Sequence, residues 1–170
     1  TRQDLANYYH EVSRTDYYLG LLLEELENQG IADNTYVIYM SDNGRPFPRA
    51  KTRVYDSGMK TPFIVWSKGN IEPAVCDALV SSIDVAPTLV ELAGIEPHRR
   101  FQGVSFKPLL EGPAPVTRKY IFAEHNWHVY RAHERMVRHG DFMYIWNAYP
   151  EKRNMCVESA PVFPAGVELW

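Results

Sequence analysis

The chain has 170 residues, enough for one domain with its own core, and its 45% apolar and 23% charged residues are typical of a globular protein. The formal net charge of −3 gives no indication of a nucleic-acid partner. No apolar run approaches the roughly 20 residues that a membrane-spanning helix requires, so the sequence predicts no membrane span.

The first thirty residues predict one long amphipathic helix. Thr1 and Asp4 fit a capping signature, and Gly30 fits a left-handed cap at the other end. Between them, apolar side chains recur at three- and four-residue steps: Leu5, Tyr8, Tyr9, Val12, Leu19, Leu22, Leu23 and Leu26. Because the chain begins directly in this pattern, and closes without a stop signal, we expect it to be a piece of a longer protein.

Residues 36–40 predict a buried strand, because they form a continuous apolar run after a turn signal at residues 33–34. A helix, a short turn and such a strand make up half of a βαβ unit, which favours an α/β fold with a mostly parallel sheet flanked by helices. The strand stops at the polar residues 41–44. Open α/β sheets carry their chemistry at strand ends of this kind.

Residues 45–60 predict a loop, because Pro46 and Pro48 fit neither a helix nor a central strand. Within it, Gly58 is expected to provide either a positive φ or a close approach of two backbone segments. A second strand is predicted over residues 61–66, which are again apolar.

The middle of the chain predicts a helix that begins at Asp84, as its N-cap, and ends at Gly94. Residues 106–110 predict one more helical turn, and residues 120–123 a short strand.

The Gly-Pro-Ala-Pro stretch at residues 112–115 resembles a linker and separates two regions of different character. After it, residues 135–138 and 142–146 flank a three-residue loop that contains glycine, which predicts an antiparallel hairpin with one solvated face. We therefore expect residues 1–112 to belong to the α/β domain, and residues 116–170 to begin a small C-terminal α+β subdomain that is incomplete in this chain.

Asp42 and Asn43 place two hard oxygen ligands side by side at the end of the first predicted strand. Because a Ca²⁺ or Mg²⁺ site needs about six oxygens, these two cannot form one alone. A simple Asp-Asn-Gly turn is the alternative, and local physics favours it. Lys51 follows nine positions after Asp42, where its ammonium group could neutralise a bound anion or simply face solvent. Arg49 and Arg53 are weaker candidates for the same contact.

His125 and His128 lie just after the strand predicted at residues 120–123, in a segment rich in histidine and arginine. Such a segment could receive an anionic substrate, and a structural role is equally compatible with it. Zinc is disfavoured, because a His-x-x-His pattern in a loop does not guarantee ligand geometry. The two cysteines, Cys76 and Cys156, could form one disulfide, although two free thiols are favoured.

Five segments follow one another in a recognisable order. Residues 35–44 end in S-D-N-G, Lys51 follows, and residues 55–62 read Y-D-S-G-M-K-T-P. Residues 81–94 match a helix with the pattern V-D-x-x-P-T, which reads Ile-Asp at its start in this chain. Residues 102–110 match a D-G-x-S-x-x-P-L-L segment, with Gln102 in place of the usual Asp. Together they resemble the second half of the catalytic domain of type I sulfatases, in the alkaline-phosphatase superfamily. The N-G-x-P-F-P loop and the E-H-x-x-H segment resemble the heparan N-sulfatase-like branch.

The resemblance implies a role for each residue that matches a family motif. Asp42 and Asn43 match two metal ligands, usually for Ca²⁺. Lys51 matches a basic residue that contacts the sulfate, which implies a catalytic and substrate-binding role. His125 and His128 fall where this branch approaches the sugar, which implies substrate binding.

The resemblance also implies a sulfatase mechanism that uses formylglycine, made from a cysteine or serine in a C/S-x-P-S/A-R motif. This chain has no such motif: Cys76 lies in V-C-D-A-L and Cys156 in M-C-V-E-S. We therefore expect a fragment of a sulfatase that is inactive by itself and that depends on the missing N-terminal part of the same protein.

The expected substrate of the parent is a sulfated carbohydrate or another sulfate ester, with O-sulfate and N-sulfate both compatible. The expected compartment, again from the resemblance, is secreted, periplasmic or lysosomal. Two alternatives remain: a phosphate-ester hydrolase of the same superfamily, and a non-catalytic binding or accessory module that keeps the fold without the chemistry.

Overall fold

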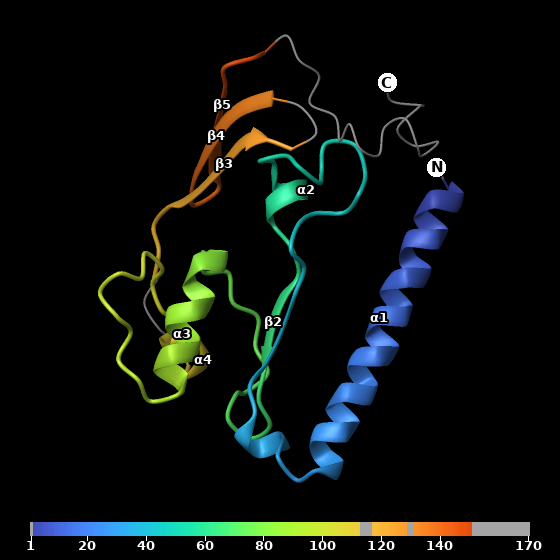
Figure 1. Ribbon diagram of the computed structural model, residues 1–170, viewed down its shortest axis with the longest axis vertical. Coiled ribbons are helices and arrows are strands. Elements are labelled where there is room, and N and C mark those ends of the chain that lie inside the picture. Colours follow the sequence, from blue (N-terminus) through green and yellow to red (C-terminus); the bar gives the residue numbers. More distant parts are fainter. Residues whose placement is uncertain (1, 113–116, 129–130, 151–170) are drawn as a thin grey trace. The chain divides into compact units, whose positions relative to one another are not determined.

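The computed structural model describes residues 2–112, 117–128 and 131–150 (Figure 1). In chain order its elements are α1 (Arg2–Asn28), η1 (Ala32–Asn34), β1 (Val37–Met40), α2 (Asp56–Met59), β2 (Phe63–Trp66), η2 (Ser82–Asp84), α3 (Val85–Leu92), α4 (Lys107–Leu110), β3 (Ile121–Trp127), β4 (Arg131–His139) and β5 (Phe142–Asn147). They form two compact units. The first comprises Thr1–Lys68, Glu124–Arg135 and the described residues from Asn147 onward, and the second Gly69–Ala123 with Met136–Trp146.

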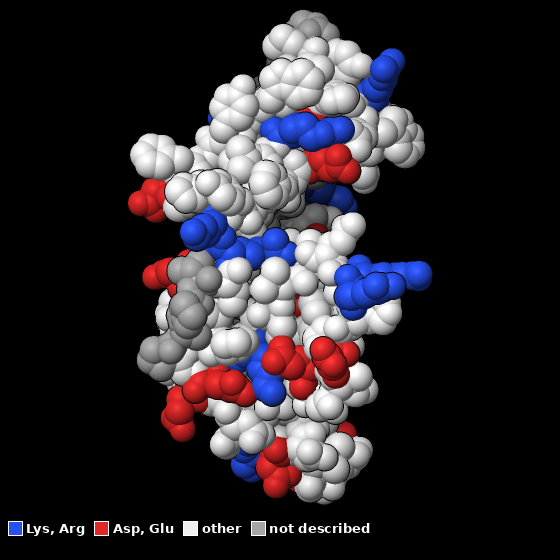
Figure 2. Space-filling model, turned by 90° about the vertical axis from the view of Figure 1, so that its left-hand side faces the viewer, with Lys and Arg blue, Asp and Glu red and all other residues white. Residues whose placement is uncertain are grey.

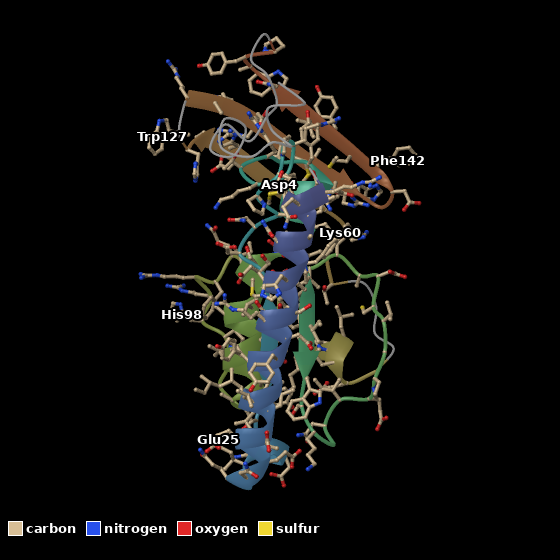
Figure 3. The ribbon with its side chains drawn as sticks, turned by 90° about the vertical axis from the view of Figure 1, so that its right-hand side faces the viewer. Asp4, Glu25, Lys60, His98, Trp127 and Phe142 are labelled. Atoms are coloured by element: carbon tan, nitrogen blue, oxygen red, sulfur yellow. The ribbon has the colours of Figure 1, made fainter. Side chains whose placement is uncertain are left out.

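Helix α1 confirms the long helix expected at the start of the chain, and Gly30, with a φ of 67°, ends it as predicted. Figure 3 labels Asp4 and Glu25 near the two ends of this helix. None of its described residues is buried, although the ring of Tyr8 meets that of Phe47 at 5.6 Å. No helix in the described part of the chain combines the length and the apolar character that a bilayer-crossing segment requires.

Strands β1 and β2 confirm both strands expected in the first unit, but their pairing is antiparallel, with Val37 opposite Trp66 and Met40 opposite Phe63. The α/β class is confirmed, whereas the parallel arrangement expected for these strands is not found in this pair. The reason lies in the connection. The loop from Ser41 to Pro62 joins the two adjacent ends, while a parallel pair needs a crossover that returns the chain to the opposite end.

In the second unit, Asp84 is completely buried and forms the centre of a hydrogen-bond network. Its carboxylate accepts hydrogen bonds from the backbone nitrogens of Ser81 (2.8 Å) and Val104 (2.7 Å), and from the guanidinium of Arg118 at 2.6 and 2.5 Å. Asp84 occupies the N-cap position of α3, as predicted, but its side chain makes no cap hydrogen bond to that helix. Its carboxylate instead closes a capping box that begins at Ser81, one turn earlier, because a 3-10 turn (η2) precedes α3.

The charge of Asp84 is stabilised by these partners. Burial by itself would raise the pKa of the Asp84 carboxyl, but the hydrogen bonds from Arg118, Ser81 and Val104 outweigh it and hold the pKa below its ordinary value of 3.8. The same pairing raises the pKa of the Arg118 guanidinium. One turn further on, the hydroxyl of Thr88 donates to the Asp84 carbonyl oxygen and accepts from the backbone nitrogen of Phe106.

Strands β3, β4 and β5 form an antiparallel sheet in that order. Its hairpin turns at Gly140 and Asp141, one residue fewer than expected, and Gly140 has a φ of 53°. Alternate residues of β4 are buried, namely Ala132, Glu134 and Met136, which confirms the expected two-faced hairpin. Large side chains of β3 and β5 are exposed: Phe122, Trp127, Phe142, Tyr144 and Trp146. Figure 3 shows Trp127 and Phe142 projecting outward.

The expected linker and one of the two cysteines lie largely or wholly outside the described residues. These exclude residues 113–116, and so most of the expected linker at residues 112–115, and residues 151–170, which include Cys156. Cys76 is exposed and carries a free thiol. The face seen in Figure 2 carries positive and negative side chains interspersed among uncharged ones, as the small net charge suggests.

Candidate active site

The turn after β1 holds Asp42 and Asn43 in a fixed backbone. The hydroxyl of Ser41 donates to the carbonyl oxygen of Asn43 (2.8 Å), and the Asn43 amide nitrogen donates to the carbonyl oxygen of Gly44 (2.8 Å). The backbone nitrogen of Gly44 in turn donates to Gly58 (2.9 Å). The residues therefore form a turn, and this turn leaves the Asn43 side-chain oxygen as an acceptor. Asp42 is exposed, and no described residue engages its carboxylate in a hydrogen bond or ion pair.

The following loop brings Lys51 back toward this turn. The carbonyl oxygen of Arg45 accepts hydrogen bonds from the backbone nitrogens of Phe47 (2.8 Å) and Lys51 (3.1 Å). The backbone of Lys51 is thus tied to a residue that lies two positions after Asn43, although nine positions separate Lys51 from Asp42. Lys51 is half-buried, and its ammonium group has no hydrogen-bond or ion-pair partner among the described residues.

Two strained residues and two tight contacts give the loop its shape. Arg49 and Thr52 adopt positive φ values of 64° and 67°, and for the β-branched Thr52 this conformation is unfavourable. The Ser57 hydroxyl donates to the Arg49 carbonyl oxygen (2.6 Å), and the Arg49 guanidinium lies 5.2 Å from the centre of the Tyr55 ring. Arg49, which the sequence offered as a weaker anion contact, therefore has an aromatic partner within the loop.

Gly58 confirms the close backbone approach expected of it. A Cβ added at Gly58 would lie 2.2 Å from the carbonyl oxygen of Arg53 and 2.3 Å from that of Ala50. Ala50 and Val54 are also buried, at 1% and 2% exposure. The loop that carries Lys51 is therefore closely packed on its inner side, and only a residue without a side chain fits at Gly58.

Arg53, the other weaker candidate for anion binding, points into the protein. Its Nη1 atom lies 3.4 Å from Oε1 of Glu134 on β4, and both side chains are 2% exposed. The other carboxylate oxygen of Glu134, Oε2, lies 3.2 Å from Nδ1 of His125 on β3. A buried carboxylate thus connects the Lys51 loop to the histidine segment within the first unit.

The two predicted substrate-binding histidines have different environments. His125 is the buried one, at 9% exposure, and its ring faces Glu134. His128 is exposed, and it follows Trp127 at the end of β3. The structure thus brings His125 together with the Lys51 loop, through Glu134 and Arg53.

The metal-ligating capacity of the described residues is limited. They contain no group of three or more histidine, cysteine or acidic side chains that could hold a metal ion. Asp42 and Asn43 supply side-chain oxygens, the donors that Ca²⁺ and Mg²⁺ prefer, but only two where about six are needed. The two side-chain oxygens are therefore of the type that binds such a cation, but they are enough for only part of a binding site.

Glu134 was missed in reading the sequence, although a signal for it exists. In the strand, Ala132, Glu134 and Met136 alternate with more polar residues, so a period of two places Glu134 on the apolar face. A carboxylate on an apolar face requires a charged or hydrogen-bonding partner. The sequence could therefore have predicted a buried acidic residue here, but not that its partners would be Arg53 and His125.

Comparison with protein families gives two overlapping matches. The model of the sulfatase family matches residues 1–95, and the model described as N-sulphoglucosamine sulphohydrolase, C-terminal, matches residues 49–145. Each match covers more than half of the chain. The chain belongs to the sulfatase family. The resemblance derived from the motifs is thereby confirmed, and Asp42, Asn43 and Lys51 all lie within the matched residues.

This chain is similar to individual sulfatases over part of their length. It is 33% identical over 157 residues to an ulvan-active sulfatase of Formosa agariphila, covering 89% of this chain and 25% of that protein. It is 40% identical over 92 residues to the human N-sulphoglucosamine sulphohydrolase, covering 53% of this chain and 18% of that enzyme. The chain thus spans a quarter or less of the length of these relatives.

Two solved structures share the fold of this chain. A 2-O GAG sulfatase matches with a TM-score of 0.59 and 25% identity, over 72% of this chain and 28% of that one. A phosphonate monoester hydrolase from Silicibacter pomeroyi also matches with a TM-score of 0.59, at 23% identity, over 90% of this chain and 36% of that one. At that identity the second match shows the shared fold alone.

Proposed function

We propose that this chain is the C-terminal portion of a sulfatase that hydrolyses sulfate esters or sulfamates of sulfated carbohydrates. By the parent protein we mean the complete translation product that contains these 170 residues. The support is the family membership, together with relatives named as an ulvan-active sulfatase and an N-sulphoglucosamine sulphohydrolase. The observation that carries the proposal is the loop closure at Arg45, which ties Lys51 to the turn of Asp42 and Asn43.

In this proposal Asp42 and Asn43 are two of the ligands of a bound Ca²⁺. When bound, such a cation withdraws charge from the sulfate oxygens and orients the ester for attack. The exposed carboxylate of Asp42 supplies one anionic donor, and the Asn43 side-chain oxygen a neutral one, while the amide nitrogen of Asn43 is held by Gly44. The remaining ligands would come from other parts of the parent protein.

Lys51 provides the fixed positive charge of this chain for the sulfate. Its ammonium is unengaged among the described residues, and its backbone is fixed by the Arg45 carbonyl oxygen. A preorganised cation of this kind stabilises negative charge that develops on the sulfate oxygens, at no cost in reorganisation. His128, which is exposed, would meet the sugar. His125, which is buried against Glu134 three positions earlier, would support this segment from within the first unit.

The nucleophile, expected to be a formylglycine, lies outside this chain, since no C/S-x-P-S/A-R motif occurs in its 170 residues. The isolated chain is therefore proposed to be inactive. It would contribute two metal ligands, one cation and part of the sugar contact to a site completed elsewhere in the parent.

The test is release of inorganic sulfate by the purified parent protein, measured by ion chromatography with N-sulfated and 6-O-sulfated glucosamine as separate substrates. We expect sulfate from at least one sulfated saccharide, and none from the isolated 170-residue chain. Absence of sulfate release by the parent, in the presence of Ca²⁺ and with a matured nucleophile, would refute the proposal. Turnover of a chromogenic aryl sulfate by the isolated chain would refute its second part.

A further inference from the structure

Three side chains that can carry charge are buried in a row in the first unit. Arg53 comes from the loop that carries Lys51, Glu134 from β4 and His125 from β3. The carboxylate of Glu134 lies between the other two, with Oε1 3.4 Å from Nη1 of Arg53 and Oε2 3.2 Å from Nδ1 of His125. We refer to these residues as the Glu134 network.

A network of this kind has no evident advantage for stability alone. Burying a carboxylate and a guanidinium costs desolvation free energy, and a well-packed apolar pair of similar volume is often as stable or more so. What the ionic arrangement adds is a defined orientation of the groups that it joins. A carboxylate with two oxygens engaged by partners on different segments fixes how these segments meet and how an imidazole ring is turned.

The segments that Glu134 connects are those to which the sequence assigned substrate contacts. Arg53 lies two positions after Lys51, and the intervening Thr52 has a φ of 67°, so the chain direction changes sharply between the cation and its anchor. On the other side, His125 lies three positions before the exposed His128. A shift of the Glu134 side chain would therefore displace both the loop that carries Lys51 and the segment that carries His128.

We propose that Glu134 is a positioning residue of the sulfatase site, which orients His125 directly and anchors the Lys51 loop through Arg53. This inference rests on the proposed function, because Lys51 and the histidine segment are assigned to the sulfate and the sugar there. Glu134 itself is 2% exposed, so it acts through its two partners and not by touching the substrate.

The first experiment uses Glu134→Gln in the full-length parent protein, which keeps the shape of the side chain and removes its charge. We expect kcat/KM for the sulfated saccharide to fall on the order of 10-fold to 100-fold, as for other small misplacements of catalytic groups. The matched control is Arg118→Gln, which breaks the partly buried Asp84–Arg118 ion pair in the second unit. This control is expected to lower the melting temperature without changing kcat/KM.

A double variant separates positioning from a merely structural role. Arg53→Met combined with Glu134→Met replaces both buried charges by apolar side chains, which removes the unpaired charge that a single substitution leaves behind. We expect the melting temperature to recover toward the wild-type value while kcat/KM stays low. Recovery of kcat/KM together with the melting temperature would overturn the proposal, because a structural role alone would then explain the single variant.

A spectroscopic measurement follows the His125 ring without turnover. In the parent labelled with ¹⁵N-histidine, Glu134→Gln is expected to shift the ring nitrogen resonances of His125, and Arg118→Gln to leave them unchanged. Unchanged His125 resonances in Glu134→Gln would overturn the proposal. A wild-type parent that turns over the saccharide while Glu134→Gln matches its kcat/KM would refute this inference alone. A wild-type parent without sulfatase activity would refute the proposed function, and this inference would fall with it.

Discussion

The backbone nitrogen of Lys51 donates a 3.1 Å hydrogen bond to the carbonyl oxygen of Arg45, and this bond closes the loop between them. The same carbonyl oxygen accepts from Phe47, and Gly44 is held by Gly58, so the loop is fastened close to the end of β1. Lys51 lies nine positions after Asp42 in the sequence, but this hydrogen bond holds its backbone next to Arg45, just after the turn that carries Asp42. The properties expected of Lys51, Asp42 and Gly58 depend on this closure and on the packing beneath it.

Lys51 is expected to act through its positive charge. In the parent protein, Lys51→Ala should lower kcat/KM for a sulfated saccharide by roughly 10²-fold to 10³-fold, the loss typical of one removed charge-stabilising donor. Lys51→Arg retains the charge and can engage two sulfate oxygens, so it should stay within about tenfold of wild type. Steady-state kinetics of both variants provide the measurement. Equal losses in the two variants would argue against a role based on charge.

Asp42 is expected to determine cation binding. Asp42→Ala in the parent should weaken Ca²⁺ binding on the order of tenfold or more, because the affinity of oxygen-ligand sites depends on the number of charged ligands. Asp16→Ala is the control, since Asp16 is an exposed carboxylate on α1. Isothermal titration calorimetry of the parent and both variants tests the prediction. The isolated chain should bind Ca²⁺ only weakly, and tight binding that Asp42→Ala abolishes would contradict that expectation.

Gly58 is expected to tolerate no side chain. Gly58→Ala would place a Cβ 2.2 Å from the Arg53 carbonyl oxygen, so the loop must move, and we expect a loss of stability of about 1–3 kcal/mol. Gly20 provides a matched control within α1, because nothing lies within 4 Å of an added Cβ there. Gly20→Ala should be neutral or stabilise by roughly 0.5–1 kcal/mol. Denaturant unfolding of the two variants should therefore shift in opposite directions.

Asp84 is expected to make stability depend on pH. Its folded-state pKa lies below the ordinary value of 3.8, although burial opposes this, because Arg118, Ser81 and Val104 donate to the carboxylate. A depressed carboxyl pKa contributes stability that is fully present above the unfolded-state pKa and is lost as the pH falls through the folded-state pKa.

Asp84→Asn removes this titration while keeping the shape of the side chain. The difference in free energy of unfolding between wild type and Asp84→Asn should therefore stay constant from about pH 7 to about pH 5 and shrink below about pH 4. Urea unfolding of the parent at these pH values measures it. A difference that persists undiminished to low pH would show that the charge of Asp84 does not contribute.

Local patterns predicted the positions of most elements, because each depends on neighbouring residues. The 3.6-residue period of apolar side chains gave α1, the β-branched runs gave β1 and β2, and the glycine between two apolar segments gave the β4–β5 hairpin. The sequence did not predict how β1 and β2 pair, because a parallel sheet was expected and the pair is antiparallel. The antiparallel register of β1 and β2 depends on how the loop between them returns, and no period within either strand encodes that.

The sequence by itself determined the family and the local placement of Asp42 and Asn43, because both follow from short motifs whose chemistry is local. Only the tertiary structure decided that Lys51 is tied to Arg45, and that Arg53 faces Glu134 and His125 instead of an anion. These contacts join residues up to 81 positions apart. They depend on the free energy of burying charges together, which a residue's neighbours in sequence do not reveal.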